Sequence, residues 1–233
     1  GGSALPEGTV DEERFRSQLQ NRVSQDAKPQ DWFETYMSAV SVCLSGSPID
    51  QDIRLVEKSV ENFEYVAELL RMFPNARFVH ILRSPYSNLV SLRSFLPHQR
   101  LQRMVMTIHD SFYYAVKNSR LTDAYCKVHY EDLVAKTEHA VRRIADALAL
   151  SFERTLLTPT SLGVPWEGNS TEVDSFEGVS AERLGTWKAR INPLEIHLIN
   201  QILGDRLDEF GYDRVTPESS YLWPMSEEDP KDY

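Results

Sequence analysis

Hydrophobic residues recur at helical spacing along most of the chain. Between residues 31 and 44 they fall every three or four positions, which predicts an amphipathic helix that Ser45-Gly46-Ser47-Pro48 ends. The same spacing predicts further helices over residues 12–23, 59–70, 84–96, 101–119, 138–150 and 193–210. The pattern therefore predicts helices over much of the chain.

Three short apolar runs alternate with these helices and predict strands: residues 52–58 (DIRLVEK), 77–82 (RFVHIL) and 125–130 (YCKVHY). RFVHIL is a compact apolar run of the kind that is buried in parallel sheets. The succession of strand, helix, strand and helix from residue 52 to residue 96 predicts a βαβ crossover. We expect an α/β fold with a central parallel sheet flanked by helices.

Length and composition set the frame for this fold. The 233 residues suit a single domain over residues 1–233, with 216–233 as a tail. Residues 158–181 are rich in proline and glycine, and a loop of that length is often a functional lid.

No apolar run approaches the roughly 20 residues of a membrane span. Cys43 and Cys126 stand far apart without a C-x-x-C pair, so neither a zinc site nor a disulfide framework is predicted.

The distribution of charge is more informative than its sum. The formal net charge of -10 argues against a nucleic-acid partner, because polyanions are bound by basic faces. Yet residues 69–109 contain no Asp or Glu. The basic residues in this acid-free stretch are Arg71, Arg77, His80, Arg83, Arg93, His98, Arg100, Arg103 and His109. Individual arginines here can simply solvate helix faces, but the stretch as a whole predicts an anion-binding site.

The predicted centre of that site is Arg83, which follows the RFVHIL strand. Its planar fork suits a phosphate, and the helix that starts at Ser84-Pro85 adds backbone donors. Ser91 lies two helical turns further on and can add a hydroxyl, although a helix serine often only bonds its own backbone. Lys58 is expected at a strand-to-helix junction on the same sheet edge, with an ordinary surface lysine as the alternative interpretation.

A long ordered set of motifs gives this arrangement a family resemblance. Residues 57–95 (EKSVENFEYVAELLRMFPNARFVHILRSPYSNLVSLRSF) resemble the central block of the sulfotransferase superfamily. The likeness continues through VHYEDLV (128–134), GNS (168–170) and LGTWK (184–188), so that it spans roughly residues 50–215. It is similar above all to the bacterial, Golgi tyrosylprotein-like and heparan-type branches.

The resemblance implies a P-loop NTPase-like three-layer fold and a transferase activity. Such an enzyme moves a sulfuryl group from PAPS (3′-phosphoadenosine 5′-phosphosulfate) to a hydroxyl or amine and releases adenosine 3′,5′-bisphosphate, without a metal. Arg83 and Ser91 would bind the 3′-phosphate of PAPS, and Tyr130 would lie near the adenine or the sulfuryl end.

The resemblance also implies roles for three residues elsewhere in the chain. Lys58 would stabilise the bridging oxygen as the sulfate leaves, and Ser170 would assist from the long loop. Arg183 would add a second contact to the 3′-phosphate, although related sequences often place the basic residue where Thr186 stands.

One family motif has no counterpart here. The 5′-phosphosulfate loop, R-x-G-[TS]-[TS]-x-[LW] after a strand, should lie upstream of Lys58, and no segment matches it. Either this loop precedes residue 1, or the chain is a catalytically inactive relative that serves as a nucleotide-binding or scaffold protein. A nucleoside-type kinase is disfavoured because no G-K-[ST] occurs.

The resemblance leaves the acceptor open among small molecules, carbohydrates and peptides, because variable loops form acceptor pockets. It favours a bacterial cytoplasmic location, with the Golgi lumen as the alternative if an upstream anchor was removed.

Overall fold

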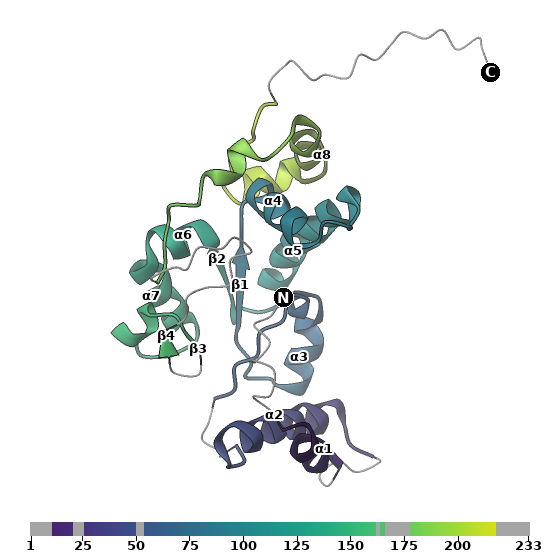
Figure 1. Cartoon of the computed structure of the whole chain (residues 1–233), viewed down its shortest axis with the longest axis vertical. Coiled ribbons are helices and arrows are strands. Elements are labelled where there is room, and N and C mark those ends of the chain that lie inside the picture. Colours follow the sequence, from purple (N-terminus) through teal and green to yellow (C-terminus); the bar gives the residue numbers. More distant parts are fainter. Residues whose placement is uncertain (1–10, 21–25, 50–53, 162–163, 166–177, 218–233) are drawn as a thin grey trace, which may run out of the picture. The chain divides into compact units, whose positions relative to one another are not determined.

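The computed structural model describes residues 11–20, 26–49, 54–161, 164–165 and 178–217. The chain divides into two compact units, Gly1–Arg77 and Phe78–Tyr233 (Figure 1). Each unit is treated below by itself, and the single domain over residues 1–233 stays a prediction.

The described part of the first unit is helical. It contains α1 (Glu12–Gln20), α2 (Pro29–Ser45), the short 3-10 helix η1 (Asn62–Tyr65) and α3 (Val66–Met72). Pro29 takes the first helical position of α2, where a missing N–H costs nothing. Gly46 ends α2 with a φ of 81°, a left-handed conformation that glycine adopts without strain. The amphipathic helix predicted over residues 31–44 is therefore confirmed.

The strand predicted over residues 52–58 is wrong for its described part. Residues 54–58 have no regular structure, and Val56 is 79% exposed. A strand forms only where a neighbour takes up its hydrogen bonds, and among the described residues no segment pairs with this one. Ser59 does not cap a helix either, because its hydroxyl donates to Glu57 Oε1 at 2.8 Å and η1 starts at Asn62.

The parallel crossover joins the second and third of the predicted strands, and not the first and second. Strands β1 (Phe78–Leu82) and β2 (Tyr125–His129) pair in parallel, with a register that runs from Phe78 opposite Tyr125 to Leu82 opposite His129. Their connection contains α4 (Pro85–Phe95) and α5 (Leu101–Leu121). Two of the three predicted strands are therefore confirmed, and the fold is mostly helical with a small two-stranded parallel sheet.

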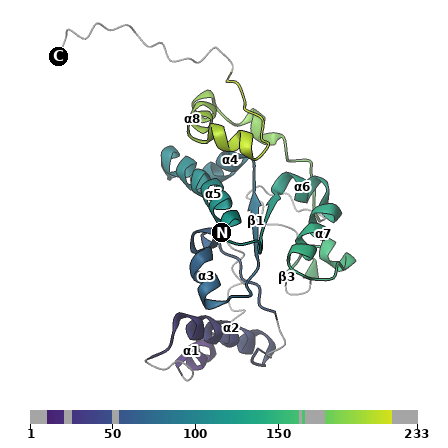
Figure 2. The same ribbon diagram turned by 180° about the vertical axis from the view of Figure 1, so that it is seen from behind.

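Helices lie on both sides of this sheet. Figures 1 and 2 show α5 on one side of β1 and β2 and α7 (Thr137–Ala147) on the other. Between β2 and α7 lies the short helix α6 (Tyr130–Ala135). The flanking helices are thus as expected, although the sheet that the described residues form is much smaller than predicted.

The remaining elements complete the second unit. They are η2 (Arg154–Leu157), the antiparallel pair β3 (Thr160–Ser161) and β4 (Val164–Pro165), η3 (Thr186–Ala189) and α8 (Pro193–Glu209). Most of the predicted lid over 158–181 lies outside the described residues. Within the described ranges, no helix is both long and apolar enough to cross a bilayer.

The hydrophobic core of the second unit joins α4, α5 and α8 to the end of β1. Its largest fully buried side chains are Leu82, Tyr86, Leu89, Ile108, Phe112, Ile199, Leu203 and Leu207. Asn192 caps α8 by accepting from the Glu195 backbone N–H at 3.0 Å. This core holds the start of α4 in place just beyond the last residue of β1.

A network of polar side chains connects the two strands of this sheet to α5. His80 of β1 bonds Tyr125 Oη through Nδ1 at 2.6 Å and Ser111 Oγ through Nε2 at 2.9 Å. Burial, assisted by the nearby Lys127, lowers the pKa of His80 from 6.5 to about 4. The neutral imidazole therefore links β1, β2 and α5, with one ring nitrogen donating and the other accepting.

Candidate active site

The carboxyl ends of β1 and β2 meet at one edge of the sheet, and this edge carries the predicted anion-binding residue. Leu82 and His129 are the last paired residues of the ladder, and Arg83 and Tyr130 directly follow them in the two segments. The Arg83 guanidinium carbon lies 4.8 Å from the centroid of the Tyr130 ring. This is a cation–π contact, which is favourable when the pair is partly withdrawn from water. The structure thus brings together two of the predicted residues from segments far apart in the sequence.

A buried serine fixes the guanidinium from the other side. Arg83 Nε donates to Ser87 Oγ at 2.9 Å, and Ser87 is only 5% exposed. Within the described residues, the guanidinium contacts Ser87 Oγ and the Tyr130 ring, and no carboxylate pairs with it. Sequence reasoning missed Ser87, although its spacing of four from Arg83 at a helix start was a usable signal.

Ser91 shares a face of α4 with Ser87, because the two serines are four positions apart within the helix. Arg83 precedes α4, which begins at Pro85, and the hydrogen bond to Ser87 links it to this helix. Ser91 itself is exposed, and its role in phosphate binding stays a prediction.

The start of α4 differs from the expectation in one respect. Ser84 is the N-cap residue, but its side chain makes no capping bond. Its backbone N–H donates to Glu131 Oε1 at 2.9 Å, and Glu131 Oε2 accepts from the Tyr212 hydroxyl at 3.2 Å. One of the donors predicted for an anion is therefore already taken by a carboxylate. Glu131 was missed, although an acid directly after Tyr130 at this sheet edge was a signal.

Other arginines of the acid-free stretch have structural roles. Arg93 forms an ion pair with Glu195, which is 2% exposed, and donates to the Arg190 carbonyl at 2.7 Å. Arg71 pairs with Glu68 at 3.0 Å. For Arg71, an exposed residue with an exposed partner, the simpler interpretation as a helix-surface arginine holds, whereas Arg93 links α4 to the buried Glu195 of α8.

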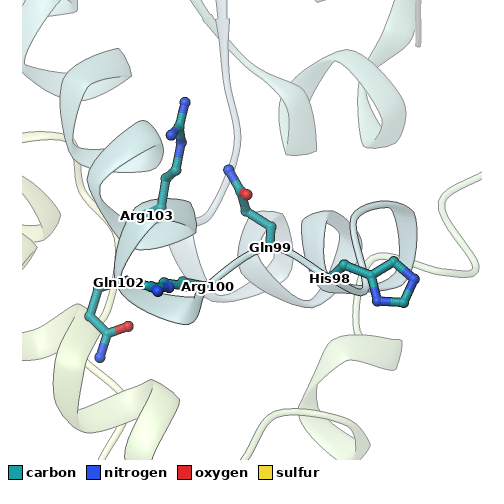
Figure 3. Close-up of a pocket in the computed structure, with 5 residues that line it drawn as sticks. All are labelled: His98, Gln99, Arg100, Gln102 and Arg103. Carbon is teal, nitrogen blue, oxygen red and sulfur yellow. The ribbon is translucent and has the colours of Figure 1, made fainter.

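A second basic region lies at the corner between α4 and α5. A pocket of about 690 Å³ is lined there by His98, Gln99, Arg100, Gln102 and Arg103. Figure 3 shows Arg103 and Gln99 extending to the same side of the chain, whereas Gln102 and His98 point in other directions. Helix α4, about 16 Å long for its 11 residues, separates this corner from Arg83. The corner is basic, but its side chains do not converge on one point.

The three other predicted residues stand differently. Lys58 belongs to the first unit, where it is exposed on the irregular segment and not at the end of a strand. Arg183 is half-buried in the second unit, and its carbonyl accepts from the Thr186 hydroxyl at 3.0 Å. Ser170 lies outside the described residues. In the described part of the chain, no group of three His, Cys, Asp or Glu side chains could hold a metal ion.

Comparison with known proteins identifies the family of this chain. The sequence profile of the sulfotransferase family matches residues 4–154, which include Lys58, Arg83, Ser91 and Tyr130. The chain belongs to the sulfotransferase family.

Two curated relatives share the name omega-hydroxy-beta-dihydromenaquinone-9 sulfotransferase Stf3. They come from Mycobacterium bovis (strain ATCC BAA-935 / AF2122/97) and Mycobacterium tuberculosis (strain CDC 1551 / Oshkosh). Each is 26% identical over 174 residues, which are 67% of this chain and 40% of the relative. The chain thus spans about two fifths of the length of these relatives.

Two solved structures share the fold. The sulfotransferase domain from the Synechococcus PCC 7002 olefin synthase has a TM-score of 0.59 at 20% identity, and the match covers 91% of this chain and 78% of that domain. The sulfotransferase domain from the curacin biosynthetic pathway has a TM-score of 0.54 at 17% identity, with 76% and 66% covered. At this level of identity the likeness concerns the fold alone.

Proposed function

We propose that this protein transfers a sulfuryl group from PAPS to a hydroxyl or amine acceptor and releases adenosine 3′,5′-bisphosphate. The observation that carries the proposal is the placement of Arg83. In a member of the sulfotransferase family, its guanidinium lies at the carboxyl edge of two parallel strands, packed on Tyr130 and held by Ser87. Ligands of parallel α/β folds bind at this edge.

Arg83 is the proposed contact to the 3′-phosphate of the donor. A guanidinium binds phosphate through two parallel hydrogen bonds, and a guanidinium already fixed at Nε loses less side-chain entropy when it does so. Ser91 adds a hydroxyl from the face of α4 that it shares with Ser87, and Arg183 is the proposed second contact. Tyr130 holds the guanidinium and lies beside the bound nucleotide.

Lys58 and Ser170 are the proposed catalytic residues. In sulfuryl transfer, a bond forms between sulfur and the acceptor oxygen or nitrogen while the bond to the bridging oxygen of the donor breaks. Negative charge then builds on the leaving oxygen, as in phosphoryl transfer, and a positioned ammonium group stabilises it. Lys58 supplies this charge, and the Ser170 hydroxyl adds a hydrogen bond.

A hydroxyl acceptor on a small molecule is the first class to test. The curated relatives are named for a hydroxylated dihydromenaquinone, which is a small molecule with a terminal hydroxyl. Carbohydrate and peptide acceptors belong to the same test. A bacterial cytoplasmic location is part of the proposal because the matched relatives are bacterial.

The decisive experiment measures transfer of labelled sulfate from PAPS by the full-length protein across a panel of hydroxyl and amine acceptors. Adenosine 3′,5′-bisphosphate should also raise the melting temperature of the protein, because ligands that bind only the folded state stabilise it. Binding without transfer to any acceptor would favour the inactive nucleotide-binding relative. A melting temperature that does not respond to the nucleotide would contradict both functions.

A further inference from the structure

Glu131 connects three segments at the edge where Arg83 lies. It follows Tyr130 directly, accepts from the Ser84 N–H at 2.9 Å, and accepts from the Tyr212 hydroxyl at 3.2 Å. We call this pair of hydrogen bonds the Glu131 clamp. We propose that Glu131 is a positioning residue that holds Arg83 beside Tyr130 through the Ser84 backbone. The inference rests on the proposed function for its ligand, but the clamp itself is a property of the protein.

The register of the sheet explains why a clamp is needed here. The ladder ends with Leu82 opposite His129. Arg83 and Ser84 are the residues that follow β1, and Tyr130 and Glu131 are those that follow β2. Tyr130 and Pro85 are already the first residues of α6 and α4, so both chains leave the strand conformation at this point. In a longer parallel ladder, the Ser84 N–H would donate to a backbone carbonyl of the partner strand. Here it donates to the Glu131 side chain instead.

The charge of Glu131 suits the place that it occupies. Helix α4 has no acidic residue of its own in its first turn, and Ser84 provides no side-chain cap. A carboxylate beside the first N–H groups of a helix satisfies a donor and interacts favourably with the helix dipole. Glu131 therefore stabilises the start of α4 from a different segment, and the residue it fixes is the direct neighbour of Arg83.

Tyr212 extends the clamp to the segment after α8. Its ring stacks on His129 at a centroid distance of 5.1 Å and packs edge-on against Phe112 at 5.9 Å. Burial, followed by the charge of Glu131, raises the pKa of Tyr212 well above its usual range, so the phenol remains a hydrogen-bond donor at neutral and alkaline pH. The position of the Arg83–Ser84 turn is thus coupled to the residues that follow the last helix.

A purely electrostatic role for Glu131 predicts the opposite effect of its removal on nucleotide affinity. If Glu131 acted only as a negative charge near an anion site, its removal would reduce repulsion and tighten nucleotide binding. If it positions Arg83, its removal weakens binding in spite of the lost negative charge. Asp132 offers the matched control, because it carries the same charge one residue further on and, among the described residues, its carboxylate accepts from Lys136 at 3.4 Å and not from Ser84.

The test compares Glu131→Ala, Glu131→Gln, Tyr212→Phe and Asp132→Asn in the otherwise unchanged protein. Two quantities are measured for each: the Kd for adenosine 3′,5′-bisphosphate by calorimetry, and the hydrogen exchange of the Ser84 amide by NMR. We expect Glu131→Ala to weaken binding about tenfold and to remove the protection of the Ser84 amide. Glu131→Gln keeps an oxygen acceptor and should stay within about threefold of wild type. Tyr212→Phe should weaken binding about two- to threefold, and Asp132→Asn should not weaken it.

The outcomes separate the clamp from the proposed function. If the wild-type protein does not bind the nucleotide, the proposed function fails, whereas Ser84 exchange still decides whether the clamp exists. If the wild type binds and Glu131→Ala binds equally well or more tightly, the positioning role is overturned. Should Glu131→Ala fail to fold, then Glu131→Gln and Tyr212→Phe decide. Unchanged affinity and Ser84 protection in Tyr212→Phe would remove Tyr212 from the clamp, and loss of binding in Glu131→Gln with Ser84 still protected would contradict positioning.

Discussion

Two basic regions of the second unit come from the same acid-free stretch and differ in how their cations are held. At the β1 edge, Arg83 is fixed by the Tyr130 ring and by Ser87, so its fork points in a defined direction. At the α4–α5 corner, Arg100 and Arg103 are exposed, and the side chains around them diverge (Figure 3). The number of positive charges is larger at the corner, but the β1 edge is better organised for a specific anion.

This difference teaches that organisation, and not local charge, indicates a binding site. A mobile surface arginine loses side-chain conformational entropy when it binds a ligand. An arginine that other side chains already fix has lost most of this entropy during folding. Arg93 differs from both, because its guanidinium forms an ion pair with the buried Glu195 and donates to the Arg190 carbonyl. The comparison leads to four predictions, from the largest expected effect to the smallest.

Lys58 tests whether an exposed cation can have a chemical role instead of a binding role. Lys58→Ala should lower the rate of sulfuryl transfer about 100-fold, because the charge on the leaving oxygen loses its stabilisation. The Kd for the donor should change by less than about threefold. Single-turnover kinetics and calorimetry measure the two quantities, with Lys117→Ala as an exposed-lysine control. Equal losses of rate and affinity would reassign Lys58 to binding.

Arg83 tests directly whether the fixed arginine at the β1 edge binds the nucleotide. Arg83→Ala should weaken the binding of adenosine 3′,5′-bisphosphate about 30-fold, since a charge-assisted hydrogen bond contributes about 2 kcal/mol. The nucleotide should then no longer raise the melting temperature at concentrations that saturate the wild type. Arg120→Ala, which removes an exposed arginine at the far end of α5, is the control. An unchanged affinity for Arg83→Ala would move the phosphate site elsewhere.

Two of the three histidines of the stretch, His80 and His98, differ in the same way as the arginines. His80 is held neutral in the fold with a pKa of about 4, whereas the unfolded chain takes up a proton near the usual pKa of 6.5. Stability is therefore lost as the pH falls from about 6.5 towards 4, and the loss between pH 7 and pH 5 should be about 2 kcal/mol. Denaturant unfolding should show a flatter pH dependence for His80→Asn. His98→Asn at the exposed corner should follow the wild type, and parallel curves for all three proteins would contradict the role of His80.

The corner provides the smallest expected effect. The double substitution of Arg100→Ala and Arg103→Ala should change the nucleotide Kd by less than about twofold at physiological salt, because both arginines are exposed beyond the far end of α4 and salt largely screens exposed charges. Calorimetry at 0.15 M salt measures this. A tenfold loss would show that the corner, and not the β1 edge, holds the donor.

Much of the fold could be predicted, and the exceptions have a common cause. The runs RFVHIL and YCKVHY formed strands because they pair with each other in parallel, and Leu82, Tyr125 and Val128 are buried, although Ile81 is 48% exposed. The run DIRLVEK contains four charged residues among its seven, and residues 54–58 lack a partner strand among the described residues. Strand formation depends on a neighbour that local sequence does not specify.

The sequence by itself determined the family, the helices and the candidate Arg83, because these depend on the order of residues and on periodicity within one segment. Only the tertiary structure decided which arginines are paired, that Tyr130 lies beneath the guanidinium, and that Glu131 and Ser87 support it. The physical reason is that a hydrogen bond or an ion pair needs atoms within about 3 Å. Residues such as Ser84 and Glu131, 47 positions apart, reach that distance only after β1 and β2 have paired.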